Sequence, residues 1–167
     1  MQVDLAFGKN GLEANLPSGF EYRLLEAKSA APLADEIAAL EHAVLNPIGT
    51  PSLAELAQGK RSAAISVCDI TRPVPNSRTL PIILRTLEQA GIPSENITIC
   101  IATGLHRIAT PAELDEILSP AIAAKYRVFN HDAKILSDHR YLGETASGIP
   151  VYVAEPLVSA DLRITLG

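Results

Sequence analysis

The chain has 167 residues, 47% of them hydrophobic and 20% charged, a balance typical of a folded domain rather than of a disordered segment. Its formal net charge is −5 at pH 7, and it has no basic patch with interleaved aromatic residues, which argues against nucleic-acid binding. It contains neither a run of about 18 apolar residues nor a basic segment followed by an apolar core. We therefore expect no membrane span and no signal peptide.

The first third of the chain predicts small, separate elements. Apolar and polar residues alternate over residues 3–7 and 12–16 around a glycine-flanked turn, which indicates a β-hairpin. A third short strand is expected at residues 22–25. Apolar residues at helical spacing predict a helix over residues 33–45, and a capping-box sequence opens a short helix over residues 52–59.

Strands and helices alternate through the rest of the chain, and buried strands joined by helices favour a parallel sheet. We predict an α/β fold, a Rossmann-like three-layer domain with a mostly parallel sheet and a small antiparallel N-terminal hairpin, with residues 1–167 as a single domain. The predicted strands are residues 63–68, 97–102, 127–130 and 162–166, the helices 80–90, 110–118 and 119–126, and a second hairpin 141–145 with 151–154.

The chain stops at Gly167, directly after a predicted strand, where an α/β protein normally continues with a loop and a helix. We therefore expect residues 1–167 to be the N-terminal part of a longer chain. An uncovered edge strand invites pairing between copies, so a homodimer is also expected as a possibility. Cys68 and Cys100 lie inside apolar runs without metal-ligand spacing, which predicts two buried free thiols in a reducing cytoplasm.

The segment Asp69-Ile70-Thr71-Arg72-Pro73 carries the strongest functional signal. It connects a buried strand to a helix, and ligands bind at the carboxyl ends of strands in open α/β sheets. The carboxylate of Asp69 and the guanidinium of Arg72 suit a small anionic ligand, because guanidinium binds carboxylate or phosphate with two hydrogen bonds. The alternative is a structural loop, in which Asp69 caps the turn and Arg72 pairs with a surface acid.

The segment Ala102-Thr103-Gly104-Leu105-His106-Arg107 follows the next buried strand, so it is expected at the same sheet edge. Gly104 allows a positive φ or a close approach of the backbone to a ligand. The imidazole of His106 suits proton transfer near neutral pH, although a lone histidine is more often structural. His131 follows a third strand and either joins this edge or belongs to a polar loop, and His139 is expected in solvent. No cluster of histidines or cysteines has metal-ligand spacing, so no metal site is predicted in this chain.

With both loops considered together, the chain resembles the N-terminal part of the lactate racemase family, the enzymes that use a nickel-pincer nucleotide. The Asp-x-Thr-Arg-Pro loop stands here at residues 69–73 and the Ala-Thr-Gly-x-His-Arg loop at residues 102–107. The resemblance implies interconversion of the stereoisomers of a 2-hydroxy acid by hydride transfer to the cofactor. It also implies catalytic roles for His106, at the substrate hydroxyl, and Arg72, at the substrate.

The resemblance further implies that Asp69 and Thr71, together with Thr103 and Gly104, line the cofactor site. The family's second catalytic histidine, its cofactor-anchoring lysine and its nickel-ligating histidine all lie beyond the end of this chain. We therefore expect this chain alone to be inactive and the remainder of its own chain to be its main partner.

Many family members carry histidine where this chain has Ile70, which indicates a 2-hydroxy acid other than lactate. Two alternatives remain: a related hydroxy-acid oxidoreductase, and a non-catalytic domain that binds small anions.

Overall fold

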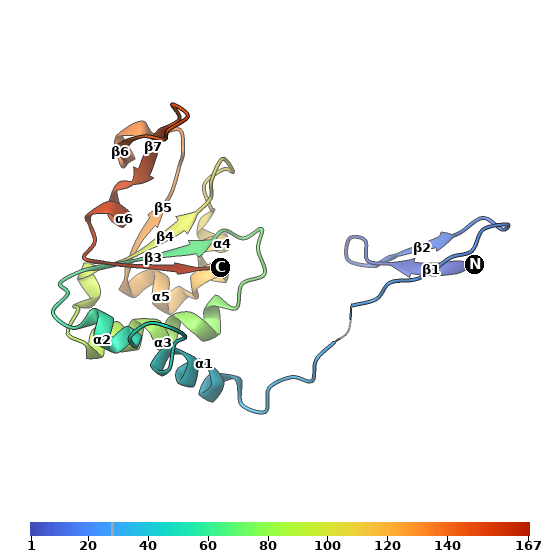
Figure 1. The fold of residues 1–167 in the computed structure, drawn as a ribbon, viewed down its shortest axis with the longest axis horizontal. Coiled ribbons are helices and arrows are strands. Elements are labelled where there is room, and N and C mark those ends of the chain that lie inside the picture. Colours follow the sequence, from blue (N-terminus) through green and yellow to red (C-terminus); the bar gives the residue numbers. More distant parts are fainter. Residues whose placement is uncertain (28) are drawn as a thin grey trace. The chain divides into compact units, whose positions relative to one another are not determined.

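The computed structural model describes residues 1–27 and 29–167. The chain divides into two compact units, Met1–Pro32 and Leu33–Gly167, and each is described by itself (Figure 1). The expectation that residues 1–167 act as a single domain stays a prediction.

The first unit contains an antiparallel hairpin of β1 (Gln2–Leu5) and β2 (Leu12–Asn15). Gly8 and Gly11 in its turn have φ of 55° and 75°, a conformation that glycine adopts without strain. The predicted hairpin is thereby confirmed. The strand predicted at residues 22–25 is wrong, because this segment has no strand assignment and joins no ladder in the described part of the chain. A strand needs a neighbour to pair its backbone groups, and β1–β2 is the sheet of this unit.

The second unit is built on a four-stranded sheet in the order β5-β4-β3-β8, drawn in the left half of Figure 1. All three pairings are parallel, and Ser66 in β3 lies opposite Cys100 in β4 and Thr165 in β8. The parallel α/β fold predicted from the alternating elements is confirmed. The strands are β3 (Ala63–Cys68), β4 (Ile97–Ala102), β5 (Arg127–Asn130) and β8 (Leu162–Leu166).

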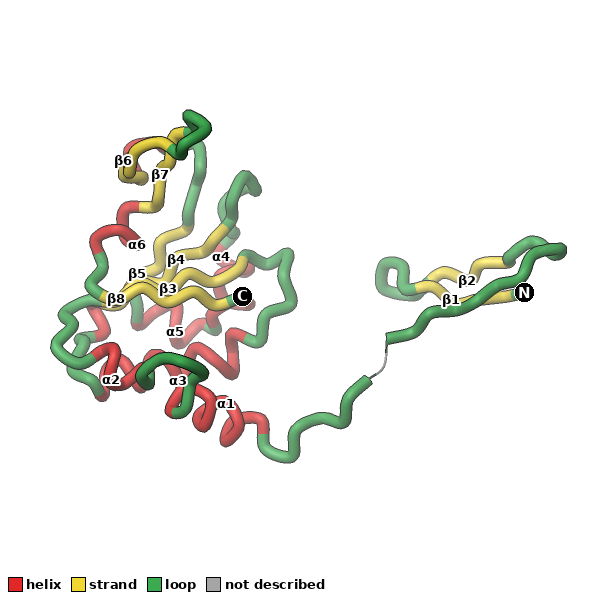
Figure 2. Tube along the Cα trace, viewed as in Figure 1, coloured by secondary structure: helices red, strands yellow, loops and turns green. Residues whose placement is uncertain are grey.

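One face of the sheet is covered by helices, which form the lower layer in Figures 1 and 2. The hydrophobic core lies between this face of the sheet and the helices. Its fully buried side chains include Ile65 of β3, Ile99 of β4, and Leu80, Leu84 and Leu87 of α3. Burying each such side chain stabilises the fold by about 1.5–3 kcal/mol. The helices and helical turn are α1 (Glu36–Leu45), α2 (Leu53–Ala57), α3 (Asn76–Gln89), η1 (Ser94–Asn96), α4 (Pro111–Leu118) and α5 (Pro120–Lys125).

The other face of the sheet carries a second antiparallel hairpin and a short helix, drawn above the sheet in Figure 1. The hairpin consists of β6 (His139–Glu144), which follows the turn η2 (Leu136–Asp138), and β7 (Pro150–Ala154). Helix α6 (Glu155–Ser159) follows β7 directly. A hollow of about 530 Å³ lies between β3 and β4 on one side and β7 and α6 on the other. This second hairpin was predicted, whereas α6 was not.

Helix starts follow local capping chemistry. Ser52 and Thr110 form complete capping boxes with Glu55 and Glu113, so α2 and α4 begin where the sequence predicts. Helix α3 begins four residues earlier than the apolar spacing indicates, at Asn76 rather than residue 80. Its first turn, Asn76 to Thr79, contains only polar residues, so it contributes nothing to the hydrophobic periodicity from which the start was predicted.

Candidate functional site

Asp69 lies directly after β3, and its side chain is only 9% exposed. One carboxylate oxygen, Oδ1, accepts hydrogen bonds from the Thr71 hydroxyl at 2.6 Å and from the Thr71 amide at 3.3 Å. The other oxygen, Oδ2, lies 2.7 Å from Nδ1 of His106. The Thr71 hydroxyl first, and then His106, lower the pKa of Asp69 below its ordinary value. The carboxylate is therefore ionised at neutral pH and fixed on both sides.

His106 lies in the loop that follows β4, and its side chain is 56% exposed. Because an ionised carboxylate can only accept, Nδ1 of His106 carries the proton in this contact. In the neutral imidazole the lone pair is then on Nε2. The sheet thus brings together two side chains from consecutive predicted loops and leaves one basic nitrogen facing solvent.

The loop that carries His106 is fixed on its C-terminal side. Arg107 donates two hydrogen bonds to the carboxylate of Glu113, at 2.8 and 2.6 Å. Arg107 and the capping contact with Thr110 lower the pKa of Glu113 to about 2. Gly104 has a φ of 58°, and a Cβ built on it would meet no atom within 4 Å. Glycine is therefore required here for backbone conformation and not for space.

Asn130, at the end of β5, holds the same loop through a pair of backbone contacts. Its side chain accepts from the Ala109 amide at 3.0 Å and donates to the Ala109 carbonyl at 2.7 Å. Sequence reasoning missed this contact. The available signal was the position of Asn130 at a strand end, next to the edge at which the His106 loop was expected.

Arg72 is exposed in the loop after Asp69. Its amide donates to the Asp69 carbonyl at 3.2 Å, and its guanidinium makes no hydrogen bond or ion pair with residues 1–27 or 29–167. The alternative in which Arg72 pairs with a surface acid is therefore not what the structure shows. The N–H donors of the Arg72 guanidinium are therefore available to a ligand.

Two hollows meet at Asp69. One, of about 330 Å³, is lined by Arg72, Asn76 and Glu116, and the other, of about 300 Å³, by His106, Arg107 and Glu113. Both are also lined by Ile70 and Thr71. In the first hollow, Oδ1 of Asn76 is buried without a hydrogen-bond partner in the described part of the chain. Buried polar atoms are nearly always paired, so this oxygen suits a donor group on a bound ligand.

Thr103 is 2% exposed and its hydroxyl is already engaged. It donates to the His131 carbonyl at 2.7 Å and lies 2.9 Å from Nδ1 of His131. Nε2 of His131 in turn lies 2.8 Å from Nε2 of His139. The expectation that His139 is in solvent is wrong, because the ring packs against His131 and is only partly exposed.

Within residues 1–27 and 29–167, no group of three or more His, Cys, Asp or Glu side chains converges to hold a metal ion. Across the same residues, no helix combines the length and the apolar character that crossing a bilayer requires. Cys68 and Cys100 are both free, and burial raises the pKa of the Cys100 thiol to about 11.

The fold and the site define an α/β domain that gathers a carboxylate–imidazole pair and an available guanidinium at the carboxyl end of a parallel sheet. Comparison with known families identifies which domain this is. The family described as the lactate racemase N-terminal domain matches residues 7–167, and the chain belongs to this family.

Individual relatives agree with this assignment. The lactate racemase of Thermoanaerobacterium thermosaccharolyticum is 30% identical over 167 residues, and the lactate racemase of Lactiplantibacillus plantarum is 31% identical over the same length. Each alignment covers 99% of this chain but 39% of the relative. The solved lactate racemase apoprotein from T. thermosaccharolyticum superimposes with a TM-score of 0.85 at 30% identity, over 99% of this chain and 38% of that one. The chain thus spans about two-fifths of the length of these relatives.

Proposed function

We propose that this chain is the N-terminal part of an enzyme that interconverts the stereoisomers of a 2-hydroxy acid. His106 would act as the base at the substrate hydroxyl, and Arg72 would bind the substrate carboxylate. The observation that carries the proposal is the 2.7 Å contact between Asp69 and Nδ1 of His106, because it leaves Nε2 of His106 basic and exposed. Membership of the lactate racemase family supports the same reading.

The proton transfer follows from the tautomer of His106. When the hydrogen on C2 of the substrate leaves as hydride, the hydroxyl must lose its proton to form the planar keto acid. Nε2 of His106 accepts that proton, and the ring becomes a cation. The ionised Asp69 stabilises this cation through Nδ1. For inversion, the hydride must return to the opposite face of the keto acid, and the proton would then come from a second base, which we place in the remainder of the chain.

Arg72 binds the other end of the substrate. A planar guanidinium can hold a carboxylate through two parallel hydrogen bonds, which fixes both distance and orientation. The loop that carries Arg72 is tied to Asp69 by its backbone and by Thr71. The carboxylate-binding and proton-accepting groups therefore share one anchor.

The residues present fit a nickel-pincer nucleotide, which when bound would supply the acceptor for the C2 hydride. The unpaired Oδ1 of Asn76 offers an acceptor for a polar group of such a ligand. We assign Asp69, Thr71, Thr103 and Gly104 to the cofactor side of the site. Because the Thr103 hydroxyl is already bonded to His131, its contribution would be to shape the loop, while the exposed backbone at Gly104 would meet the ligand.

The identity of the 2-hydroxy acid is proposed from Ile70. Its side chain packs partly against the core and lines both hollows next to Asp69. An apolar wall at this position favours a substrate with an apolar group larger than the methyl of lactate.

The location and the assembly of the protein are proposed from two other features. The two free thiols fit a reducing cytoplasm, and the edge strand β8 is a candidate for pairing in a homodimer.

The proposal is tested on the full-length protein, loaded with the nickel cofactor, with single stereoisomers of several 2-hydroxy acids. Chiral chromatography measures interconversion. His106→Ala is expected to lower kcat by at least about a hundredfold, whereas His42→Ala, on the exposed surface of α1, is the matched control and should not change it. Arg72→Lys is expected to lower kcat/KM by about tenfold or more because a bidentate contact is lost.

Each alternative gives a different result in this assay. Net accumulation of the keto acid with consumption of an external oxidant would indicate an oxidoreductase. Binding of hydroxy acids without turnover in the loaded protein would indicate an anion-binding domain. Full activity of His106→Ala would refute the role of His106.

A further inference from the structure

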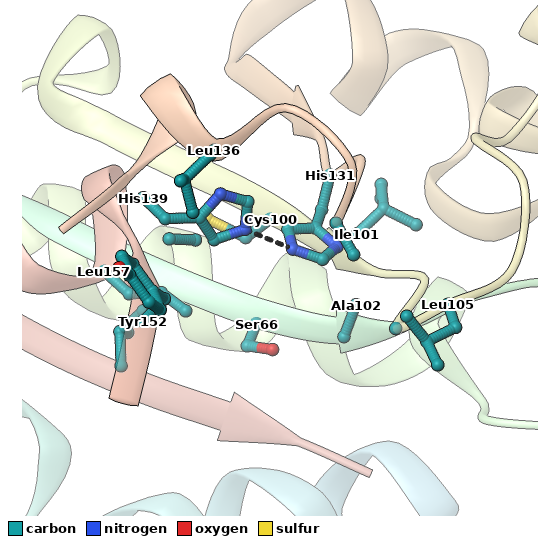
Figure 3. A pocket seen from close by; sticks show the side chains of 14 residues that line it. Ser66, Cys100, Ile101, Ala102, Leu105, His131, Leu136, His139, Tyr152 and Leu157 are labelled. Carbon is teal, nitrogen blue, oxygen red and sulfur yellow. Dashed lines mark hydrogen bonds between the residues drawn. The ribbon is translucent and has the colours of Figure 1, made fainter. Parts of the chain in front are cut away.

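His131 and His139 form a histidine pair that the proposed function does not use. His131 follows β5, and His139 is the first residue of β6. Their Nε2 atoms lie 2.8 Å apart, and their rings meet edge to face with centroids 5.0 Å apart. Figure 3 shows the two rings at the hollow between the sheet and the second hairpin, with the contact drawn as a dashed line.

The hydrogen bonds around the pair fix the number of protons it holds. The Thr103 hydroxyl has a single hydrogen, which it donates to the His131 carbonyl, so Nδ1 of His131 must donate to that hydroxyl. Nδ1 of His139 must also carry a hydrogen, because its partner at 2.9 Å is the Ile135 carbonyl. The contact between the Nε2 atoms needs one more hydrogen. Two neutral imidazoles carry one N–H hydrogen each, so the observed set of bonds requires one extra proton.

The burial of His131 determines which of the two rings carries the extra proton. Burial first, and then the charge of His139, lower the pKa of His131 below its ordinary value. The extra proton therefore resides mainly on Nε2 of His139 and is donated to Nε2 of His131. The pair is a neutral imidazole bonded to an imidazolium.

The charged and titratable groups around the pair are few. The carboxylates of Asp132 and Asp138 act on His131 and favour its charged form, opposing the effect of burial. Cys100 of β4 and Tyr152 of β7 line the same hollow, and the raised pKa of Cys100 keeps its thiol neutral below about pH 11. On β6 and α6, Arg140 is bonded to Glu155. None of these neighbouring residue types has an ordinary pKa between about 5 and 8, so the two histidines are the groups expected to change charge in that range.

We propose that His131 and His139 are a proton-sharing positioning pair, which ties the β6–β7 hairpin to the Thr103–His106 loop while it holds one extra proton. His139 belongs to the hairpin, and His131 fixes Thr103, whose carbonyl accepts the His106 amide at 3.0 Å. The contact has a pH window. At a pH above this window the extra proton is lost, and the Nε2 lone pairs of the two rings face each other. At a pH below the window both rings are protonated, so two N–H groups and two positive charges face each other.

The protonation of the pair can be read without turnover. Long-range proton–nitrogen NMR on the uniformly labelled 167-residue chain resolves the ring nitrogens of each histidine, and exposed His42 serves as the internal reference. We expect His131 in the Nδ1–H form with an unprotonated Nε2, and His139 protonated on both nitrogens, at the centre of the window. Independent titration of both rings like His42, or His131 in the Nε2–H form throughout, would overturn the proposal.

The mechanical link is read by hydrogen exchange of the His106 amide, corrected for the intrinsic rate. Its protection should be highest within the window and fall about tenfold on either side, as a charged hydrogen bond is lost. His139→Gln can still donate to Nε2 of His131 but does not titrate, so the fall on the alkaline side should vanish. The Ala90 amide, at the C-terminal end of α3, and His42→Gln are the controls. Equal pH dependence in His139→Gln and the unmodified chain would refute the link.

The effect on catalysis rests on the proposed function, and the two can fail separately. In the loaded full-length protein, His139→Gln should leave kcat at the centre of the window unchanged and flatten the alkaline limb of its pH profile. A full-length protein without racemase activity would contradict the proposed function while the NMR and exchange results still decide on the pair. An unchanged alkaline limb in an active enzyme would contradict the positioning role.

Discussion

Asp69→Asn replaces the carboxylate that holds both Thr71 and His106 while keeping its shape. The amide has one accepting oxygen, so it can satisfy either the Thr71 hydroxyl at 2.6 Å or Nδ1–H of His106 at 2.7 Å, but not both. A charge-assisted hydrogen bond contributes about 1.5–3 kcal/mol. Since the amide keeps one of the two bonds, the loss corresponds to about one charge-assisted bond. We therefore expect the free energy of unfolding to fall by about 2 kcal/mol.

The pH dependence of this loss has a definite sign. The pKa of Asp69 is lowered in the folded chain, so its stabilising effect is present above the unfolded pKa of about 3.9. The effect is lost as the pH falls through the lowered folded value. Urea denaturation followed by circular dichroism should show a constant difference between the two chains at neutral pH that disappears in strong acid. Asp115→Asn, at an exposed position on α4, is the matched control.

The same substitution also changes the tautomer of His106. If the amide NH₂ faces the ring, Nδ1 becomes the acceptor and the hydrogen moves to Nε2, which removes the basic nitrogen. We expect racemisation by the loaded full-length protein to drop by about 10²–10⁴-fold. A variant with unchanged stability at neutral pH, or one that keeps full racemisation although nitrogen NMR places the hydrogen of His106 on Nε2, would refute the reasoning from the Asp69 contact.

Three further outcomes are expected. Gly104→Ala should lower the free energy of unfolding by about 1 kcal/mol in urea denaturation, because φ is 58° while no atom lies near the added Cβ; a larger loss would mean that a contact and not backbone strain decides. Glu113→Gln should lower the melting temperature, since it weakens both the Arg107 contact and the α4 capping box. Because the pKa of Glu113 is lowered to about 2, the difference should be complete above the unfolded pKa of about 4.3 and should be lost as the pH falls towards 2. Cys100, with its pKa raised to about 11 by burial, should resist alkylation by iodoacetamide at pH about 8 in the folded chain and react in urea, as mass spectrometry of the peptides would show.

The two central strands of the sheet, β3 and β4, could be predicted residue by residue because most of their residues are buried on both faces. Strands of this kind form continuous apolar runs, and β3 and β4 have the bounds that were predicted. The starts of α2 and α4 could also be predicted, because the capping boxes at Ser52 and Thr110 are local sequence signals. The strand expected at residues 22–25 failed because a strand depends on a neighbour that local composition does not encode.

The candidate site was predictable only in part. Asp69 and His106 were expected at one sheet edge because parallel strands align their carboxyl ends, and the 2.7 Å contact confirms that they meet. The contacts of Asn130 with Ala109 and of His131 with Thr103 join positions 21 and 28 residues apart. They depend on the register between β4 and β5, in which Ile101 lies opposite Asn130, and no motif in the sequence specifies that register.

These register-dependent contacts explain how an exposed loop can hold a base in place. The Thr103–His106 segment has few apolar contacts of its own, since Gly104, Leu105 and His106 are all exposed. Its order therefore comes from polar contacts at its two ends: His131 at Thr103 on one side, and Glu113 and Asn130 at Arg107 and Ala109 on the other. Glu113 lines the hollow next to His106, whereas Asn130 and His131 do not. Substitutions at the end of β5 should thus act on the chemistry of His106 without touching the ligand.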